Sequence, residues 1–187
     1  MTSTTELIKD LRSKTGAGFL DCKNALSKNN NDLNGAIEFL RKKGLAKASK
    51  KTSREANDGA VGIYISDENK ALILKVNSET DFAAKSDTFL NFIDELGQFG
   101  LSLIADDLNI DKFLKSKNKD IQISDSFSNM IAKIGENLVL KELITINNNS
   151  QIQYYVHNSY RNNIGKIVSV LEYETNKISN DINKLTK

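Results

Sequence analysis

The 187-residue sequence predicts an α+β protein: a small helical module first, then an antiparallel sheet with helices on one face. Three observations support this prediction. Apolar residues recur at helical spacing through the first 44 positions. From residue 60 onward, short apolar runs typical of strands are joined by polar turns. Helical spacing returns twice between the first strands and the later ones, and hairpins with helices inserted between them favour an antiparallel sheet.

The helical module is expected over residues 1–45. Ser3 and Glu6 fit a capping box, in which a hydroxyl caps the first helix and a Glu three residues later reaches back to the cap. Gly16 and Gly18 are expected to stop that helix. This explains the lone Gly-Ala-Gly better than a phosphate-binding loop does, because the longer glycine motifs of such loops are absent.

Two further short helices complete the predicted module. Apolar spacing over residues 19–26 indicates the second, with Phe19, Cys22, Ala25 and Leu26 in its pattern. Cys22 is expected to be a small core residue, not a reactive thiol. A third helix is expected from an Asp32 cap to a stop at Gly44. A unit this small is marginal alone, so it should be very compact or docked on a partner.

A basic linker is expected over residues 46–58. The stretch 41–55 carries seven Lys or Arg residues against a single Glu. One interpretation is a solvated linker helix, and the other is contact with an acidic partner or RNA. No aromatic residue lies between the charges, which weakens a single-stranded nucleic-acid interpretation.

The α+β domain is expected over residues 59–175, followed by a tail over 176–187 whose apolar residues have helical spacing. The predicted elements, in order, are a hairpin over 60–76 with its turn at 67–70, a helix over 89–103, a polar segment with some helix over 106–120, a helix over 127–134 ending near Gly135, a strand over 138–146 bulged near Lys141 and Glu142, a turn over 147–150, and strands over 152–156 and 164–171.

Composition excludes several classes of protein. With one Cys, the chain cannot form an internal disulfide. One Cys and one His cannot supply the roughly four ligands of a zinc finger. A nucleophilic pair of Cys22 and His157 stays formally open, although His157 is better explained as a hydrogen-bonding residue at a strand end. An enzyme is therefore not expected, and neither is a cofactor or a bound metal.

Charge and hydropathy set the expected surroundings of the chain. The net charge is +2, from 26 Lys and Arg against 24 Asp and Glu, which argues against a surface built to coat nucleic acid. No apolar run is long enough to span a membrane, and the N-terminus lacks the features of a signal peptide. A cytoplasmic protein is expected, with no membrane or direct nucleic-acid partner.

One polar loop contains an aromatic residue that needs explanation. Phe82 lies within residues 77–85, between the predicted hairpin and the next helix. In one interpretation it forms a hydrophobic staple against the start of that helix. In the other it is exposed at a rigid strand–helix junction as an anchor for a protein partner.

The segment around Phe82 resembles a known family signature. Thr80-Asp-Phe-Ala-Ala-Lys85, preceded by Val76-Asn-Ser-Glu79, is similar to the signature loop of the translation elongation factor Ts family. Residues 11–26 resemble that family's other signature. The family pattern continues in three further segments, at residues 36–44, at 131–137, and at 155–157 followed by Ile164 and Gly165.

The resemblance implies a guanine-nucleotide exchange factor that binds elongation factor Tu in its GDP-bound and nucleotide-free states. It implies a ubiquitin-associated-like fold for the helical module and the first half of a dimerisation-type core for the domain after it. Phe82 would wedge between helices of the partner and displace its magnesium ion, while Asp81 adds a negative charge. Thr80 and Ala83 would fix the backbone approach, although family members often have Val at the place of Ala83.

Further contacts with the partner are expected from a second set of residues. They are Leu11, Arg12, Thr15, Gly16, Gly18 and His157. Long family members also carry a second core half that is not recognised here, and short members can dimerise, so a homodimer is expected as one arrangement. The rival hypothesis is a non-catalytic protein- or RNA-binding module that uses the basic residues 41–54.

Overall fold

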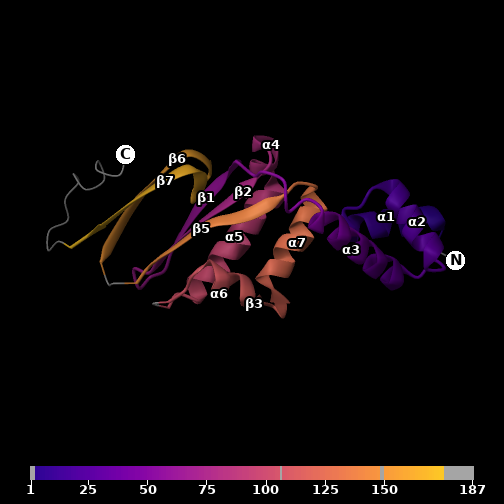
Figure 1. The fold of residues 1–187 in the computed structure, drawn as a ribbon, viewed down its shortest axis with the longest axis horizontal. Coiled ribbons are helices and arrows are strands. Elements are labelled where there is room, and N and C mark those ends of the chain that lie inside the picture. Colours follow the sequence, from indigo (N-terminus) through magenta and orange to yellow (C-terminus); the bar gives the residue numbers. More distant parts are fainter. Residues whose placement is uncertain (1–2, 106, 148–149, 175–187) are drawn as a thin grey trace.

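A computed structural model describes residues 3–105, 107–147 and 150–174. Three helices form a unit at one end of an elongated molecule, and an antiparallel sheet with helices on one face forms the rest (Figure 1). This confirms the predicted α+β class. The expected tail over 176–187 and the centre of the expected turn over 147–150 lie outside the described residues.

Local capping chemistry sets the ends of the first helix. In α1 (Thr4–Thr15), Ser3 Oγ accepts a hydrogen bond from the Glu6 backbone N–H, and the Glu6 carboxylate accepts one from the Ser3 N–H. Gly16 ends the helix at a φ of 67°, a left-handed conformation that glycine adopts without steric cost. Both predicted signals are confirmed.

The other two helices complete a small apolar core. Asp32 caps α3 (Leu33–Ser49), as predicted, by accepting hydrogen bonds from the N–H groups of the first turn. In α2 (Phe19–Lys28), Cys22 is fully buried among apolar side chains, and burial raises the pKa of its thiol. Cys22 is therefore a packing residue, as the sequence indicated. The buried residues of this core are Ile8, Leu11, Cys22, Ala25, Leu26, Ala36 and Leu40.

The prediction that Gly44 stops the third helix was wrong. The helix α3 continues through Gly44 to Ser49 and so enters the region expected to be a linker. It packs against α7 (Ile123–Ile134), and a Cβ at Gly44 would lie only 3.0 Å from the Cβ of Ala132. Ala48, one turn later, is buried in the main core. Glycine at position 44 permits close approach of the two helices. Packing against α7 and the burial of Ala48 stabilise the helical conformation beyond Gly44.

The sheet is antiparallel throughout, with the strand order β5-β2-β1-β7-β6. Opposite Lys75 and Val76, the neighbouring strand pairs Glu142 and Leu140, which leaves Lys141 as the extra residue of a bulge. The bulge predicted at Lys141 and Glu142 is thereby confirmed. The strands are β1 (Asp58–Ile65), β2 (Ala71–Ser78), β5 (Leu138–Ile146), β6 (Gln151–Arg161) and β7 (Ile164–Tyr173).

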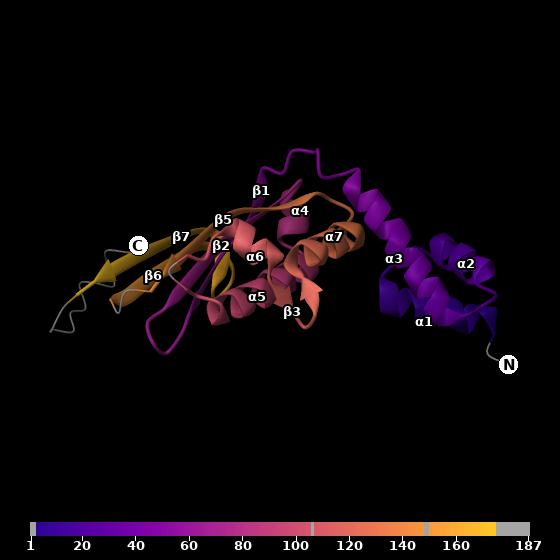
Figure 2. The same cartoon turned by 60° about the horizontal axis from the view of Figure 1, so that its bottom comes forward.

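Helices cover one face of the sheet (Figure 2). The long helix α5 (Asp87–Ser102) packs against β1 and β2, and α7 ends at Gly135 with a φ of 87°, as predicted. The polar segment over 106–120 contains α6 (Ile110–Lys115) and the start of a small hairpin of β3 (Lys117–Asn118) and β4 (Ile121–Gln122). Fully buried side chains between α5 and the sheet include Phe89, Ile93, Leu96, Leu72, Leu74 and Val76.

A polar cluster ties the β6–β7 hairpin to α5. The Tyr64 hydroxyl donates a hydrogen bond of 3.0 Å to Asp94, and Arg161 forms an ion pair of 2.5 Å with the same carboxylate. Burial, together with the charge of Asp94, raises the pKa of Tyr64 well above its usual range. The Tyr64 ring lies directly over Gly97, where an added Cβ would come within 1.9 Å of a ring carbon.

We predict that Gly97→Ala lowers the free energy of unfolding by about 1–3 kcal/mol, because the methyl group forces the Tyr64 ring out of its place. This loss outweighs the gain of about 1 kcal/mol that alanine brings to a helix interior. Urea unfolding measures it, with Gln98→Ala, an exposed neighbour on the same helix, as a control expected to change stability by less than about 0.5 kcal/mol. Equal stability of the wild type and Gly97→Ala would contradict the packing described.

Candidate functional site

The segment between β2 and α5 exposes one aromatic side chain on an anchored junction. The single-turn helix α4 (Asp81–Ala84) is capped by Thr80, whose hydroxyl oxygen accepts a hydrogen bond from the Ala83 N–H at 3.2 Å. Ala83 and Ala84 are buried against the body of the domain. Phe82 is 84% exposed, the highest value among the exposed large apolar side chains of the described residues. The hydrophobic-staple interpretation is therefore wrong, because a staple would bury Phe82.

The carboxylate next to Phe82 is tied to a neighbouring cation. Lys85 Nζ lies 2.7 Å from Asp81 Oδ2, one helical turn away, and its hydrogen bond holds the pKa of Asp81 below the usual range. Asp81 thus carries its negative charge at neutral pH, and its side chain is still 46% exposed. The junction presents an aromatic ring and a carboxylate side by side.

The start of the junction is held by a residue whose role the sequence did not reveal. Glu136, just after α7, accepts hydrogen bonds from the Thr80 N–H at 3.0 Å and from the Thr80 hydroxyl at 2.8 Å. The two residues are 56 positions apart, so no local spacing rule connects them. The family resemblance included Glu136 in a matching segment but gave no contact for it.

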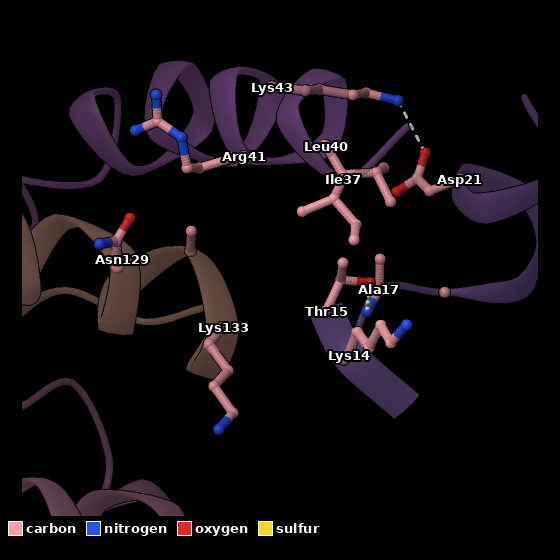
Figure 3. Close-up of a pocket in the computed structure, with 14 residues that line it drawn as sticks. Lys14, Thr15, Ala17, Asp21, Ile37, Leu40, Arg41, Lys43, Asn129 and Lys133 are labelled. Carbon is pink, nitrogen blue, oxygen red and sulfur yellow. Dashed lines mark hydrogen bonds and ion pairs between the residues drawn. The ribbon is translucent and has the colours of Figure 1, made fainter. Parts of the chain in front are cut away.

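The predicted contacts of the helical module divide between core and surface. Leu11 is fully buried in the module core, so its side chain packs beneath the surface and is not accessible to a partner. Arg12 is exposed on α1. Thr15, Gly16 and Gly18 line a pocket of about 430 Å³ between the α1–α2 turn, α3 and α7 (Figure 3). The structure thus groups three of the predicted residues at one hollow, next to the α7 helix.

The cations around this pocket are largely neutralised within the chain. Three of the four have a carboxylate partner, namely Asp10 for Lys14, Glu38 for Arg41 and Asp21 for Lys43. Ile37 and Leu40 add apolar surface from α3, pointing toward the α1–α2 turn in Figure 3. The pocket is therefore better suited to a protein surface than to a bare anion. The four cations are Lys14, Arg41, Lys43 and Lys133.

Two exposed apolar residues beside the pocket were missed. Phe19 and Leu20 open α2 directly after Gly18 and are 53% and 68% exposed. The sequence placed Phe19 on the apolar face of the helix, but the buried part of that face begins at Cys22, and the side chains of Phe19 and Leu20 stay exposed. The sequence did contain a signal for this exposure. One face of a helix cannot bury two adjacent residues equally, so at least one of Phe19 and Leu20 had to be exposed.

His157 does not lie at a strand end, contrary to the prediction. It lies within β6, opposite Ile167, is exposed, and has its ring centroid 6.1 Å from that of Tyr155. Cys22 is buried in α2, and α2 and β6 lie at opposite ends of the molecule in both views (Figure 1). A nucleophilic Cys22–His157 pair is therefore excluded.

Neither a metal-binding cluster nor a membrane-spanning helix is present within the described ranges. No group of three or more His, Cys, Asp or Glu residues there is arranged to hold a metal ion. None of the helices in those ranges combines the length and apolar character needed to cross a membrane. The features that stand out are instead surfaces: the junction at Phe82 and the hollow beside Phe19.

The fold and these surfaces define a protein suited to binding a partner. The family model described as "Elongation factor TS" matches residues 79–185, more than half of the chain. The chain is similar to elongation factor Ts of Halothermothrix orenii, with 40% identity over 183 residues that cover 94% of this chain and 60% of that protein. It is also similar to elongation factor Ts of Campylobacter hominis, with 42% identity over 173 residues that cover 90% of this chain and 47% of that protein.

This chain belongs to the elongation factor Ts family. A third relative, elongation factor Ts of Hydrogenovibrio crunogenus, is 40% identical over 172 residues, which cover 91% of this chain and 57% of that protein. The chain thus spans about half to three-fifths of the length of the curated relatives it matches. The predicted resemblance is confirmed at the level of the family.

We predict that Phe82→Ala changes the free energy of unfolding by less than about 0.5 kcal/mol, because the ring packs on almost nothing in the free protein. Phe89→Ala, by contrast, removes a fully buried ring and should cost about 3–5 kcal/mol. Urea unfolding of both variants makes the comparison. A loss in Phe82→Ala close to that of Phe89→Ala would restore the staple interpretation.

Proposed function

We propose that this chain is a guanine-nucleotide exchange factor for elongation factor Tu and acts in polypeptide elongation. It promotes GDP release by displacing the magnesium ion and loosening the phosphate site of its partner. The observation that carries the proposal is the 84% exposure of Phe82 on an anchored strand–helix junction. Membership of the elongation factor Ts family supports it.

The chemistry of the junction suits such a role. A bound guanine nucleotide is held largely through its phosphates and a bridging magnesium ion. Inserting the Phe82 ring between helices of the partner would shift the groups that hold the metal, and the Asp81 carboxylate would bring a negative charge toward the same site. No bond is made or broken, so the chain needs neither a nucleophile nor a cofactor of its own.

Thermodynamic linkage makes the complex transient. If the factor weakens GDP binding by a given ratio, GDP weakens binding of the factor by the same ratio. The chain therefore binds the nucleotide-free partner most tightly and leaves when nucleotide returns. A second contact through Arg12, Phe19 and Leu20 on the helical module would hold the factor in place while the Phe82 junction acts. A cytoplasmic location follows from this role.

The rival RNA-binding function has less support from the structure. Three of the basic residues 41–54 follow the helix α3, and two of these are engaged within the chain: Lys51 donates a hydrogen bond to the Gly135 carbonyl, and Arg54 forms an ion pair of 3.4 Å with Glu79. Only Lys50, the third, has no such bond or ion pair among the described residues. Cations that hold the chain together are not free for phosphates, so a protein partner is favoured.

A homodimer remains a prediction. Ile144 on β5 and Ile167 on β7 are about half exposed, and β5 and β6 are the two edge strands of the main sheet. Exposed apolar residues near open edges are compatible with a second copy. The mass of the protein in solution, measured over a range of concentrations, tests this, and a monomer at all concentrations would contradict it.

The exchange reaction gives the central prediction. Elongation factor Tu is loaded with a fluorescent GDP analogue, and release is followed with the wild type, Phe82→Ala and Asp81→Ala. We expect the wild type to accelerate release and Phe82→Ala to lose at least about tenfold of that acceleration, as for a buried aromatic anchor at an interface. Asp81→Ala should lose less, because Lys85 already neutralises part of its charge.

Ile121→Ala is the matched control, since it removes an exposed apolar side chain away from the junction, and should exchange like the wild type. No acceleration by the wild type would overturn the exchange function. Equal acceleration by all variants would overturn the role of the junction. Tight binding of a labelled RNA that is lost on replacing Lys50, Lys51 and Arg54 would favour the rival.

A further inference from the structure

Two glutamates hold the start of the Phe82 junction in a reciprocal arrangement. Glu136 accepts a hydrogen bond from the Thr80 backbone N–H at 3.0 Å, and Glu79 accepts one from the Asn137 backbone N–H at 2.6 Å. Each carboxylate thus binds the N–H of the residue that follows the other glutamate. We call these four residues, Glu79, Thr80, Glu136 and Asn137, the glutamate clasp.

The clasp lies partly out of water, where such bonds matter most. Asn137 is almost fully buried, and the Glu79 side chain is only 21% exposed. Hydrogen bonds from N–H groups to an ionised carboxylate are about twice as strong as neutral ones. Breaking one leaves a partly buried donor without an acceptor, which costs more than the bond itself contributes. The clasp therefore fixes its two segments tightly to each other.

A chain of hydrogen bonds carries this constraint to Phe82. The Thr80 hydroxyl donates to Glu136 at 2.8 Å and accepts from the Ala83 N–H at 3.2 Å. Because the hydroxyl hydrogen points at Glu136, the lone pair is free to cap α4. The orientation of the single turn that carries Phe82 thus depends on an acceptor at position 136.

The clasp also holds the segment that leads from the helical module. The Asn137 side chain donates to the Arg54 carbonyl at 2.6 Å, and the Arg54 side chain pairs with Glu79 at 3.4 Å. The Asn77 side chain donates to the Ala56 carbonyl at 2.8 Å. Three segments far apart in the sequence, after α3, after β2 and after α7, therefore meet at one point.

We propose that Glu136 is a positioning residue for nucleotide exchange. Acting through Thr80, it presents Phe82 in a fixed orientation, and Glu79 closes the clasp from the other side. A preorganised anchor avoids the ordering cost that a flexible loop would bear on binding. The inference rests on the proposed exchange function, since it assigns a role within that same site.

Variants of Glu136 test the proposal. In Glu136→Ala both acceptor oxygens for Thr80 are lost. The rate at which a subsaturating amount of this chain accelerates GDP release from elongation factor Tu should then fall about tenfold or more, as expected for lost hydrogen bonds to a charged group. Glu136→Gln should fall less, because one amide oxygen remains as an acceptor. Thr80→Val, which loses the hydroxyl, should resemble Glu136→Ala. Glu142→Gln, an exposed glutamate on β5 paired with Lys75, is the matched control and should match the wild type.

A double-mutant cycle separates positioning from simple destabilisation. If Glu136 acts through Phe82, Glu136→Ala should change exchange by less than about twofold in a Phe82→Ala background, because contacting residues are coupled. A purely structural role would instead lower the active fraction equally in both backgrounds. Equal fold-losses in the two backgrounds would overturn the proposal.

Hydrogen–deuterium exchange of the free protein tests the clasp without the partner. In Glu136→Ala, the amides of Thr80 and Ala83 should exchange at least about tenfold faster, as for local opening, while amides in the middle of α5 stay as in the wild type. Unchanged protection at Thr80 would overturn the clasp. If protection is lost in Glu136→Ala but the wild-type chain does not accelerate GDP release from elongation factor Tu, the clasp stands and the proposed function is overturned.

Discussion

Packing of α5 against β1 and β2 is the contact on which the rest of the structure depends. It fixes the end of β2 and the start of α5, so the short segment between them has little freedom. Gly97 brings the helix close enough for the Tyr64 ring to lie over it, and Asp94 on the same helix holds Arg161 from the β6–β7 hairpin. One helix therefore positions the Phe82 junction at its beginning and the hairpin along its length.

The helical module is joined to this body by a continuous helix and not by a loose tether. Because Gly44 allows α3 to approach α7 and Ala48 is buried in the main core, the third helix belongs to both packing units. The hollow beside Gly16 forms where these units meet. Surfaces on the module and the surface at Phe82 are thus held by one set of contacts along α7, which ends at the clasp.

Features set by neighbours in the sequence were predictable, and features set by neighbours in space were not. The capping box at Ser3 follows from hydrogen bonds between neighbours in the sequence, so the sequence located it. The bulge at Lys141 forms against a distant strand, but two adjacent polar residues that interrupt an apolar run marked its place. The role of Gly44 was predicted wrongly because the glycine allows close packing against α7, a helix distant in the sequence. Glu136 had no assigned role because its partner lies 56 positions away. The polar loop alone left the exposure of Phe82 as one of two alternatives, and the family resemblance favoured exposure. The structure shows which side of α4 is covered.

An exposed phenylalanine forgoes about 1.5–3 kcal/mol that its burial would contribute to folding. The two residues that follow it, Ala83 and Ala84, are both covered, so the turn exposes the ring while burying its small neighbours. The turn is capped, its carboxylate is paired and its first residue is bound by Glu136, all of which keep the ring outside. The stability that the free protein lacks at Phe82 becomes available when a partner covers the ring. Because the turn is already ordered, little of that free energy is lost to fixing the loop, and more remains for binding.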